Sequence, residues 1–204
     1  MNKDKRYQEI SNSIEKLYLE KEYRKIIDIK ETNSDIDFLD NTGSSYCQFS
    51  EIFTVSYIEH SRFKYALAII NRYLDYLREK DLAKCDYQDD LDTFYWLKLE
   101  IHDKQNAPLK QLRAVENYIK DGGKDNEILA LREKLQDVLF LRFVRLNKAI
   151  MILVFVIILL SILRVLSFGS TMLMSFTSIW VLWYLLNYIF HKKIKRIFLK
   201  VLVH

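Results

Sequence analysis

The chain has 204 residues with 31 Lys and Arg and 27 Asp and Glu, a length that suits one helical or mixed domain with a small additional part. All the acidic residues precede Ala149, and so do 25 of the basic ones, so the first 148 residues have a net charge of −2. These residues lack the excess of Lys and Arg that is typical of a nucleic-acid-binding domain, so we expect no nucleic-acid partner. No apolar run follows the charged first residues, so we expect no cleavable signal peptide.

The first half of the chain shows the apolar spacing of helices. Ile10, Ile14 and Leu17 are spaced for a first helix, residues 22–29 for a second, and the polar stretch 31–45 indicates a loop. Further helices are predicted at 49–60, 62–78, 93–102 and 108–120, with a charged link at 81–90. Pro108 suits the first position of a helix and Gly122-Gly123 its end. The predicted fold class is all-α.

These helices form pairs, and the second helix of each pair opens in a recurring way: Tyr23-x-x-Ile26, Phe63-x-x-Ala66 and Leu109-x-x-Leu112. In the central pair, Phe53, Tyr57, Ala66 and Ile70 stand at about the spacings of the tetratricopeptide motif. Residues 6–146 therefore resemble a degenerate tetratricopeptide-type array. The chain departs from that family in its repeat intervals of about 40 and 46 residues, where the family has 34, and in lacking a proline that closes each repeat.

The resemblance implies a surface, built by the first helix of each pair, that binds a peptide or another protein. On that analogy Tyr57, Tyr95, Trp96 and Lys98 are candidates to contact a partner. The alternative is that Tyr57 and Trp96 pack in the core, as aromatic side chains commonly do.

From Asp125 to Phe168 the sequence contains neither glycine nor proline. The apolar pattern changes along this stretch from one-sided to all-round, which predicts one continuous helix that joins the first domain to a membrane segment. A helix of this length, at about 1.5 Å per residue, is a rod of about 65 Å.

Two apolar runs at 149–168 and 172–190 have the length of membrane-spanning helices. Only Gly169, Ser170 and Thr171 separate them, so they form an antiparallel hairpin. The predicted organisation is a helical domain at 1–146, a membrane hairpin at 147–190 and a basic amphipathic tail at 191–204. The alternatives are two buried helices of a soluble core for the hairpin and a frayed end for the tail.

Basic residues predict the orientation of the hairpin, because lysine and arginine favour the cytoplasmic side of a membrane. Both ends of the hairpin carry them, whereas Arg164 is alone near the turn, where it can extend to the far headgroups or serve a function within the membrane. Both termini should face the cytoplasm. The residues assigned to lipid contact and topology are Arg164, Lys192, Lys193, Lys195, Arg196 and Lys200.

The second predicted span has two different faces. One carries the small hydroxyl side chains Ser175 and Ser178, which allow close helix packing; the other carries Trp180, Trp183 and Tyr184. Contact with a neighbouring copy explains aromatic residues at mid-membrane, and contact with lipid is the alternative. A homo-oligomer is thus one expected partner, beside the membrane itself.

Motifs for catalysis are missing: no glycine-rich phosphate loop, no His-Glu-x-x-His and no Gly-x-Ser-x-Gly occurs. Cys47 and Cys85 have no metal-ligand spacing. We expect no enzyme, no cofactor and no bound metal.

Two functions remain. The first is a membrane-anchored protein–protein interaction module, an adaptor, scaffold or immunity-type binding protein. The second is an oligomeric, membrane-perforating effector of a bacterial defence or toxin system, gated by the helical domain. The richness in Ile, Lys, Tyr and Asn is typical of an AT-rich bacterial genome and favours the inner membrane.

Overall fold

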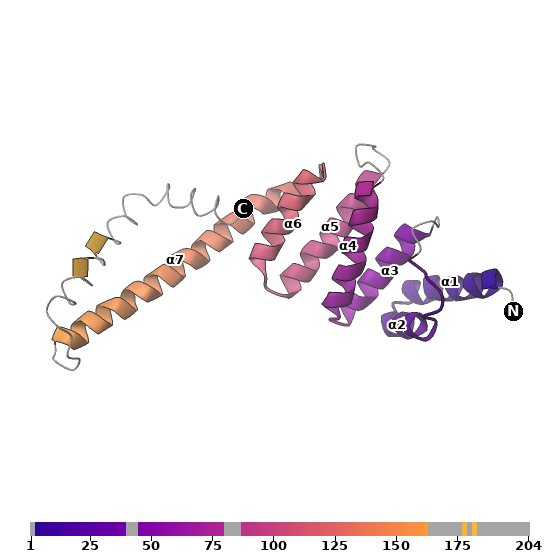
Figure 1. Ribbon diagram of the computed structural model, residues 1–204, viewed down its shortest axis with the longest axis horizontal. Helices are drawn as coiled ribbons and strands as arrows, with labels where there is room; N and C mark the ends of the chain where they lie inside the picture. Colours follow the sequence, from indigo (N-terminus) through magenta and orange to yellow (C-terminus); the bar gives the residue numbers. More distant parts are fainter. Residues whose placement is uncertain (1–2, 40–44, 80–86, 163–176, 179–180, 183–204) are drawn as a thin grey trace. The chain divides into compact units, whose positions relative to one another are not determined.

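A computed structural model of the chain describes residues 3–39, 45–79, 87–162, 177–178 and 181–182 (Figure 1). Seven helices, α1 to α7, make up the regular secondary structure of these residues, which confirms the all-α prediction. The chain divides into two compact units, Met1–Leu131 and Arg132–His204. The first unit contains the helices α1 to α6 and the start of α7.

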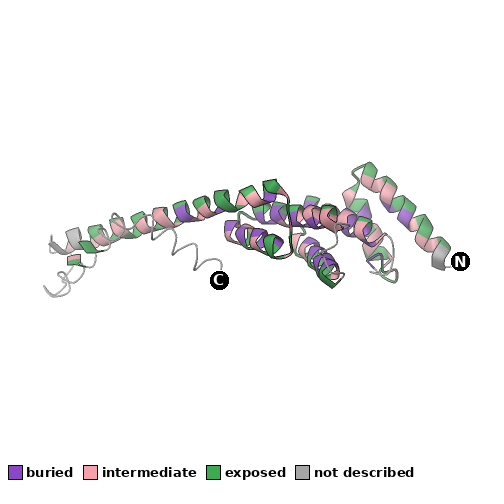
Figure 2. Cartoon of the chain, turned by 90° about the horizontal axis from the view of Figure 1, so that it is seen from above, coloured by how far each residue is buried: buried purple, intermediate pink, exposed green. Residues whose placement is uncertain are grey.

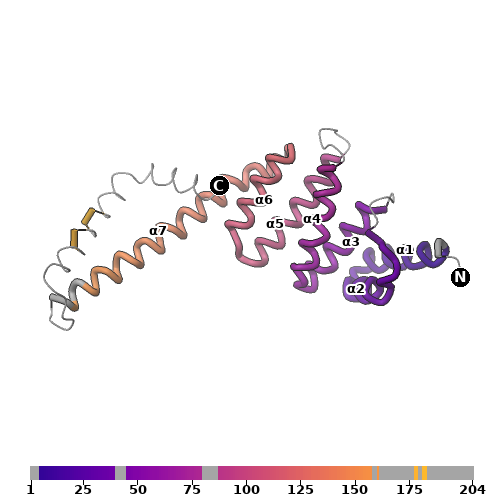
Figure 3. The backbone as a smooth tube through the Cα atoms, in the orientation of Figure 1, coloured from indigo at the N-terminus to yellow at the C-terminus, as the bar shows by residue number. Residues whose placement is uncertain are grey.

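The first six helices pack as three consecutive antiparallel pairs. These pairs are α1 (Lys3–Leu19) with α2 (Tyr23–Thr32), α3 (Tyr46–Glu59) with α4 (Phe63–Glu79), and α5 (Gln88–Lys104) with α6 (Pro108–Lys120). Neighbouring pairs contact each other through α2 and α3, and through α4 and α5. The chain can be followed through this succession in Figure 3. In addition, α3 contacts α5, the first helix of the next pair.

The turn within each pair has the same backbone geometry. Its middle residue adopts a left-handed conformation, with φ of 59° at Lys21, 56° at Ser61 and 50° at Asn106. The amide after it donates a hydrogen bond to a carbonyl five residues earlier, the bond that closes a helix in a Schellman motif. These bonds run from Glu22 to Leu17 at 2.9 Å, from Arg62 to Tyr57 at 2.8 Å and from Ala107 to His102 at 2.9 Å.

Each second helix begins two residues after the left-handed residue, at Tyr23, Phe63 and Pro108. The predicted pattern that starts at Leu109 agrees with the burial of these helices, since Leu112, like Ile26 and Ala66, is buried. Pro108 occupies the first position of α6, as predicted, where the missing amide hydrogen costs nothing.

The core of the first unit is rich in aromatic residues, and α3 is its central helix. Figure 2 shows buried positions along the helices of this unit. Large side chains that are less than 2% exposed come from each of the first six helices, and the aromatic ones among them come from α3 to α6: Phe49, Phe53, Tyr73, Phe94, Tyr95 and Tyr118. The rings of Tyr73 and Phe94 stack with their centroids 4.2 Å apart. Truncating such a residue to alanine typically costs about 3–5 kcal/mol.

Two segments differ from the expected boundaries. The helix α2 continues to Thr32, and the stretch after it is not merely polar, because Phe38 is buried against Tyr7 and Phe49. The helix α5 begins at Gln88, before the predicted start at 93. The aspartates that suggested a link there lie in the first turn of α5, where the helix dipole favours negative charge.

The last helix, α7 (Asn126–Ile162), is continuous from the predicted start as far as the structure describes it. Asp125 caps it, since its carboxylate accepts a hydrogen bond from the Glu127 amide at 2.7 Å. Within the described residues, none of the helices meets the length and hydropathy that a membrane crossing requires. The predicted first span is described only to Ile162, most of the second span lies outside the described residues, and the tail 191–204 lies wholly outside them.

Candidate functional site

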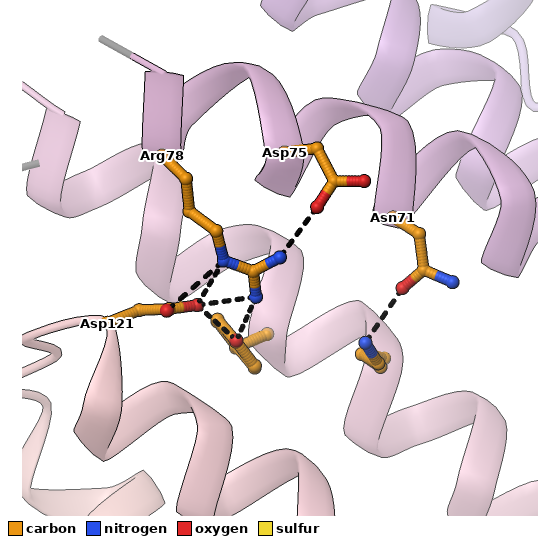
Figure 4. Close-up of polar contacts among 6 residues, drawn as sticks. Asn71, Asp75, Arg78 and Asp121 are labelled. Carbon is orange, nitrogen blue, oxygen red and sulfur yellow. Dashed lines mark hydrogen bonds and ion pairs between the residues drawn. The ribbon is translucent and has the colours of Figure 1, made fainter. Parts of the chain in front are cut away.

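An arginine at the end of α4 joins three helices through one carboxylate. The Arg78 guanidinium lies 2.8 Å from Asp121 at the end of α6, and the Tyr95 hydroxyl of α5 donates a hydrogen bond of 2.6 Å to the same carboxylate. Figure 4 shows Arg78 between Asp121 and the more exposed Asp75, which lies 2.6 Å from it. The hydrogen bond to Asp121 raises the pKa of Arg78, and burial raises the pKa of Tyr95. This cluster fixes the ends of α4 and α6 against α5.

Lys98 is directed from α5 toward α4. Its ammonium donates a hydrogen bond of 2.8 Å to the Asn71 side-chain carbonyl, drawn in Figure 4. The same ammonium lies 5.8 Å from the centre of the Tyr95 ring. Burial lowers the pKa of Lys98. Lys98 and Tyr95 therefore belong to one polar layer between α4 and α5.

Trp96 lies on a different side of α5 and is 36% exposed. Its indole nitrogen donates a hydrogen bond of 2.9 Å to the carboxylate of Asp125, the residue that caps α7. The ring borders an open, mainly apolar groove of about 650 Å³, which we call the Trp96 groove. Its lining residues come from α5, α6 and the start of α7: Thr93, Trp96, Leu97, Leu99, Glu100, Asp103, Gln111 and Leu131.

Tyr118 of α6 links Asp92 of α5 to Asp125 at the start of α7. Its hydroxyl donates to the Asp92 carboxylate at 2.6 Å and accepts a hydrogen bond from the Asp125 amide at 2.6 Å. Burial, with the hydrogen bond to Asp92, raises the pKa of Tyr118 to about 12. The hydrogen bond from Trp96 lowers the pKa of Asp125. The start of α7 is thus held by side chains of both α5 and α6.

Tyr57 lies elsewhere, on α3. It is buried, and its ring stacks on Tyr65 with the centroids 5.5 Å apart. The Lys30 ammonium lies 5.1 Å from the centre of the Tyr57 ring and 4.5 Å from that of Phe53. Burial lowers the pKa of Lys30 to about 8.

The four predicted partner residues therefore do not form one surface. Trp96 borders the groove, Tyr95 and Lys98 meet Arg78 and Asn71, and Tyr57 packs in the core. Sequence reasoning missed Glu100, Asp103, Gln111 and Leu131. Positions 93, 96, 100 and 103 fall on one side of α5, away from its apolar stripe, so helical spacing alone could have placed Glu100 and Asp103 beside Trp96. The places of Gln111 and Leu131 depend on how α6 and α7 pack against α5.

Among the residues assigned to the membrane segment, Ser178 is described and exposed. Ser175, Trp180, Trp183 and Tyr184 lie outside the described residues, as do the residues assigned to lipid contact, Arg164, Lys192, Lys193, Lys195, Arg196 and Lys200.

In the part of the chain that the structure describes, His, Cys, Asp and Glu side chains do not gather in groups of three or more that could hold a metal ion. The polar clusters around Arg78 and Tyr118 consist of groups that satisfy one another and join helices. The Trp96 groove differs from them, since it leaves an aromatic face and two carboxylates open to solvent. Comparison of the chain with protein-family models, with curated proteins and with solved structures finds no match.

Proposed function

We propose that the chain is a membrane-anchored protein–protein interaction module. In this proposal the helical pairs bind a protein partner at the cytoplasmic face of a membrane, and the segments 149–168 and 172–190 anchor them there. The support for the anchor is the composition of these segments: they are apolar over the length of a span, and basic residues flank both of their outer ends. The bacterial inner membrane is the proposed location.

The tetratricopeptide-like nature of the helical pairs is also part of this proposal. Its support is the turn that recurs at Lys21, Ser61 and Asn106, at intervals of 40 and 45 residues. The contact between α3 and α5 adds to it, because first helices of successive pairs are neighbours in such arrays. A surface made by first helices is then the expected binding side.

The observation that carries the proposal is the Trp96 groove on α5. A partly exposed tryptophan beside an apolar groove is the kind of residue that dominates binding energy at protein interfaces. The indole is oriented by its hydrogen bond to Asp125, so little conformational entropy is lost when a partner packs on it. Because Leu131 of α7 also lines the groove, a bound partner would contact the helix that leads to the predicted anchor.

The test is site-specific photo-cross-linking of the full chain in cells. A photoreactive amino acid replaces Thr93 in the groove in one variant and the exposed Lys64 of α4 in a matched control. We expect one partner to be cross-linked from Thr93 and not from Lys64, and the Trp96→Ala substitution to abolish that product. Equal products from both positions, or none from Thr93, would reject the groove as a binding surface.

A further inference from the structure

The charged side chains that line the Trp96 groove are all negative. Among its lining residues only Glu100 and Asp103 are charged, and both are acidic. The Glu100 side chain is 45% exposed, and Asp103 is exposed as well. Both carboxylates project from the same helix, α5, at the edge of an apolar surface made by Trp96, Leu97 and Leu131.

The lysines of α5 do not offset this charge fully. Lys98 is directed to Asn71 on α4. The Lys104 ammonium is shared by two carboxylates, 2.9 Å from Glu100 and 3.6 Å from Glu59. The Asp103 carboxylate accepts a hydrogen bond of 3.1 Å from the neutral side-chain amide of Gln111. The Lys104 ammonium therefore pairs with Glu100 and Glu59, whereas the Asp103 carboxylate accepts its hydrogen bond from a neutral group.

Two more carboxylates are joined to the indole by hydrogen bonds, Asp125 directly and Asp92 through Tyr118 and Asp125. Asp125 accepts the hydrogen bond of Trp96, and Asp92 accepts those of Tyr118 and Gln88. These donors are neutral, so the negative charge persists and adds to the potential around the Trp96 ring. The face of an indole itself attracts cations, arginine most of all.

We propose that the Trp96 groove binds a cationic segment of the protein partner, in which a large apolar side chain packs against Trp96 and Leu131 and flanking arginine or lysine residues pair with Glu100 and Asp103. This inference rests on the proposed function, because it names the chemical class of the partner for the same surface. The apolar contact supplies affinity, and the charges supply selection against acidic segments.

The experiment measures binding of short fluorescein-labelled peptides to the purified full chain in an uncharged detergent, by fluorescence anisotropy. The first peptide has a central leucine flanked by arginines and serines; the second has glutamates in place of the arginines; the third has alanine in place of the leucine. Two protein variants are compared with the unmodified chain. E100Q/D103N neutralises the groove, and E9Q/D28N neutralises two exposed acidic residues of α1 and α2 as a matched control.

We expect the arginine–leucine peptide to bind and the glutamate peptide not to bind. E100Q/D103N should weaken binding by about tenfold or more, while E9Q/D28N changes it little, and the leucine-to-alanine exchange should weaken it several-fold. Affinity should fall as salt is raised from about 0.05 M to about 0.5 M, because exposed charges are screened.

Three results would overturn the inference: equal binding of the arginine and glutamate peptides, no binding of either, or the same affinity in E100Q/D103N as in E9Q/D28N. Self-association of the chain that E100Q/D103N abolishes would also overturn it, since a second copy would then occupy the groove. The proposed function, binding of a protein partner, is tested separately by the cross-link from Thr93 in cells. A surviving cross-link with failed peptide binding refutes only the cationic class of partner.

Discussion

The indole nitrogen of Trp96 donates a hydrogen bond to the carboxylate of Asp125, at 2.9 Å. The middle of α5 is thereby joined to the first turn of α7, 29 residues further along the chain. The same carboxylate accepts hydrogen bonds from the amides of Glu127 and Ile128. One side chain thus both caps a helix and orients the aromatic ring at the groove.

Replacing Asp125 with alanine should remove the cap and the partner of Trp96 together. We expect a loss of about 1 kcal/mol or somewhat more in the free energy of unfolding, the usual cost of losing a capping side chain. Asp125→Asn is the control, because asparagine can still cap. Hydrogen exchange at the amides of residues 126–129 should accelerate in Asp125→Ala and much less in Asp125→Asn. Unchanged exchange in Asp125→Ala would contradict the capping role.

The pH dependence of this cap follows from the pKa of Asp125, which the hydrogen bond from Trp96 holds below its ordinary value. A carboxyl group with a lowered pKa in the folded state stabilises that state above its unfolded pKa. The contribution is lost as the pH falls through the folded pKa. The difference in stability between the unmodified chain and Asp125→Asn should therefore shrink in acid.

The two glycines after α6 should respond differently to alanine. Gly122 has φ of +82° with open space around it, so Gly122→Ala strains only the backbone, at about 1 kcal/mol. A side chain at Gly123 would overlap the ring of the buried Tyr118, and forcing atoms into a packed core typically costs about 1–3 kcal/mol.

The measurement is urea unfolding of Gly122→Ala, Gly123→Ala and the combination of Gly123→Ala with Tyr118→Leu. Tyr118→Leu alone is the reference, because it also removes the hydrogen bonds of the Tyr118 hydroxyl. Gly123→Ala should cost less free energy of unfolding in the Tyr118→Leu chain than in the unmodified chain. If Gly123→Ala is as stable as the unmodified chain, the close packing of Tyr118 on this turn is wrong.

The two carboxylate partners of Arg78, Asp121 and Asp75, give a paired test of a partly buried against an exposed ion pair. Asp121 is only 13% exposed, whereas the Asp75 side chain is 65% exposed. Arg78→Met should lower the free energy of unfolding by about 2–3 kcal/mol, since it leaves Asp121 and Tyr95 without their cationic partner. Asp75→Ala should change it by less than about 0.5 kcal/mol. Equal effects of the two substitutions, measured by denaturant unfolding, would show that the Arg78–Asp121 pair is not a structural link.

Lys30 gives a prediction in the alkaline range. Burial lowers its pKa to about 8 in the folded chain, against an ordinary value of 10.5. Between these values the unfolded chain binds more protons than the folded one, so stability rises with pH through this window. Stability of the unmodified chain relative to Lys30→Met should therefore be greater at about pH 9.5 than at about pH 7.5. A difference that stays constant or falls over this range would contradict the burial of the Lys30 amine.

Much of the fold could be predicted from the apolar periodicity, because helix-forming faces repeat at 3.6 residues and the turns carry few apolar side chains. The failures have physical reasons. The start of α5 was missed because Asp89 and Asp90 look like a polar link, although Tyr73 donates a hydrogen bond to Asp90 from α4 and the helix dipole favours both acids. Phe38 was missed because the short apolar group Ile36, Phe38 and Leu39 within a polar stretch is too brief to show a helical period.

The groove was predictable only in part. Trp96 was a candidate because the tetratricopeptide resemblance places it on the first helix of a pair, and helical spacing places Glu100 and Asp103 beside it. The choice between partner contact and core packing depended on which side of α5 faces α4. Lys98 and Tyr95 face Asn71 and Arg78 on that helix, while Trp96 faces the start of α7. Contacts between helices that are distant in sequence decide this, and periodicity within one helix cannot.

The last prediction separates a membrane anchor from a membrane-perforating assembly. If residues 147–190 only anchor the chain, an unrelated hairpin of equal length should preserve the cross-link from Thr93, because anchoring needs burial of apolar surface and not particular side chains. If copies assemble through this segment, its aromatic and hydroxyl faces must pack against each other, and such packing depends on shape.

Two pairs of substitutions test this packing. Trp180→Leu with Trp183→Leu keeps the segment apolar, and Ser175→Leu with Ser178→Leu adds bulk where backbones would meet. Membrane potential in cells that overproduce each variant, with oligomer size in detergent, is the measurement. The anchor predicts that the unmodified chain leaves the potential intact and that neither pair of substitutions changes oligomer size. Depolarisation by the unmodified chain that both pairs abolish would replace the anchor with the perforating assembly.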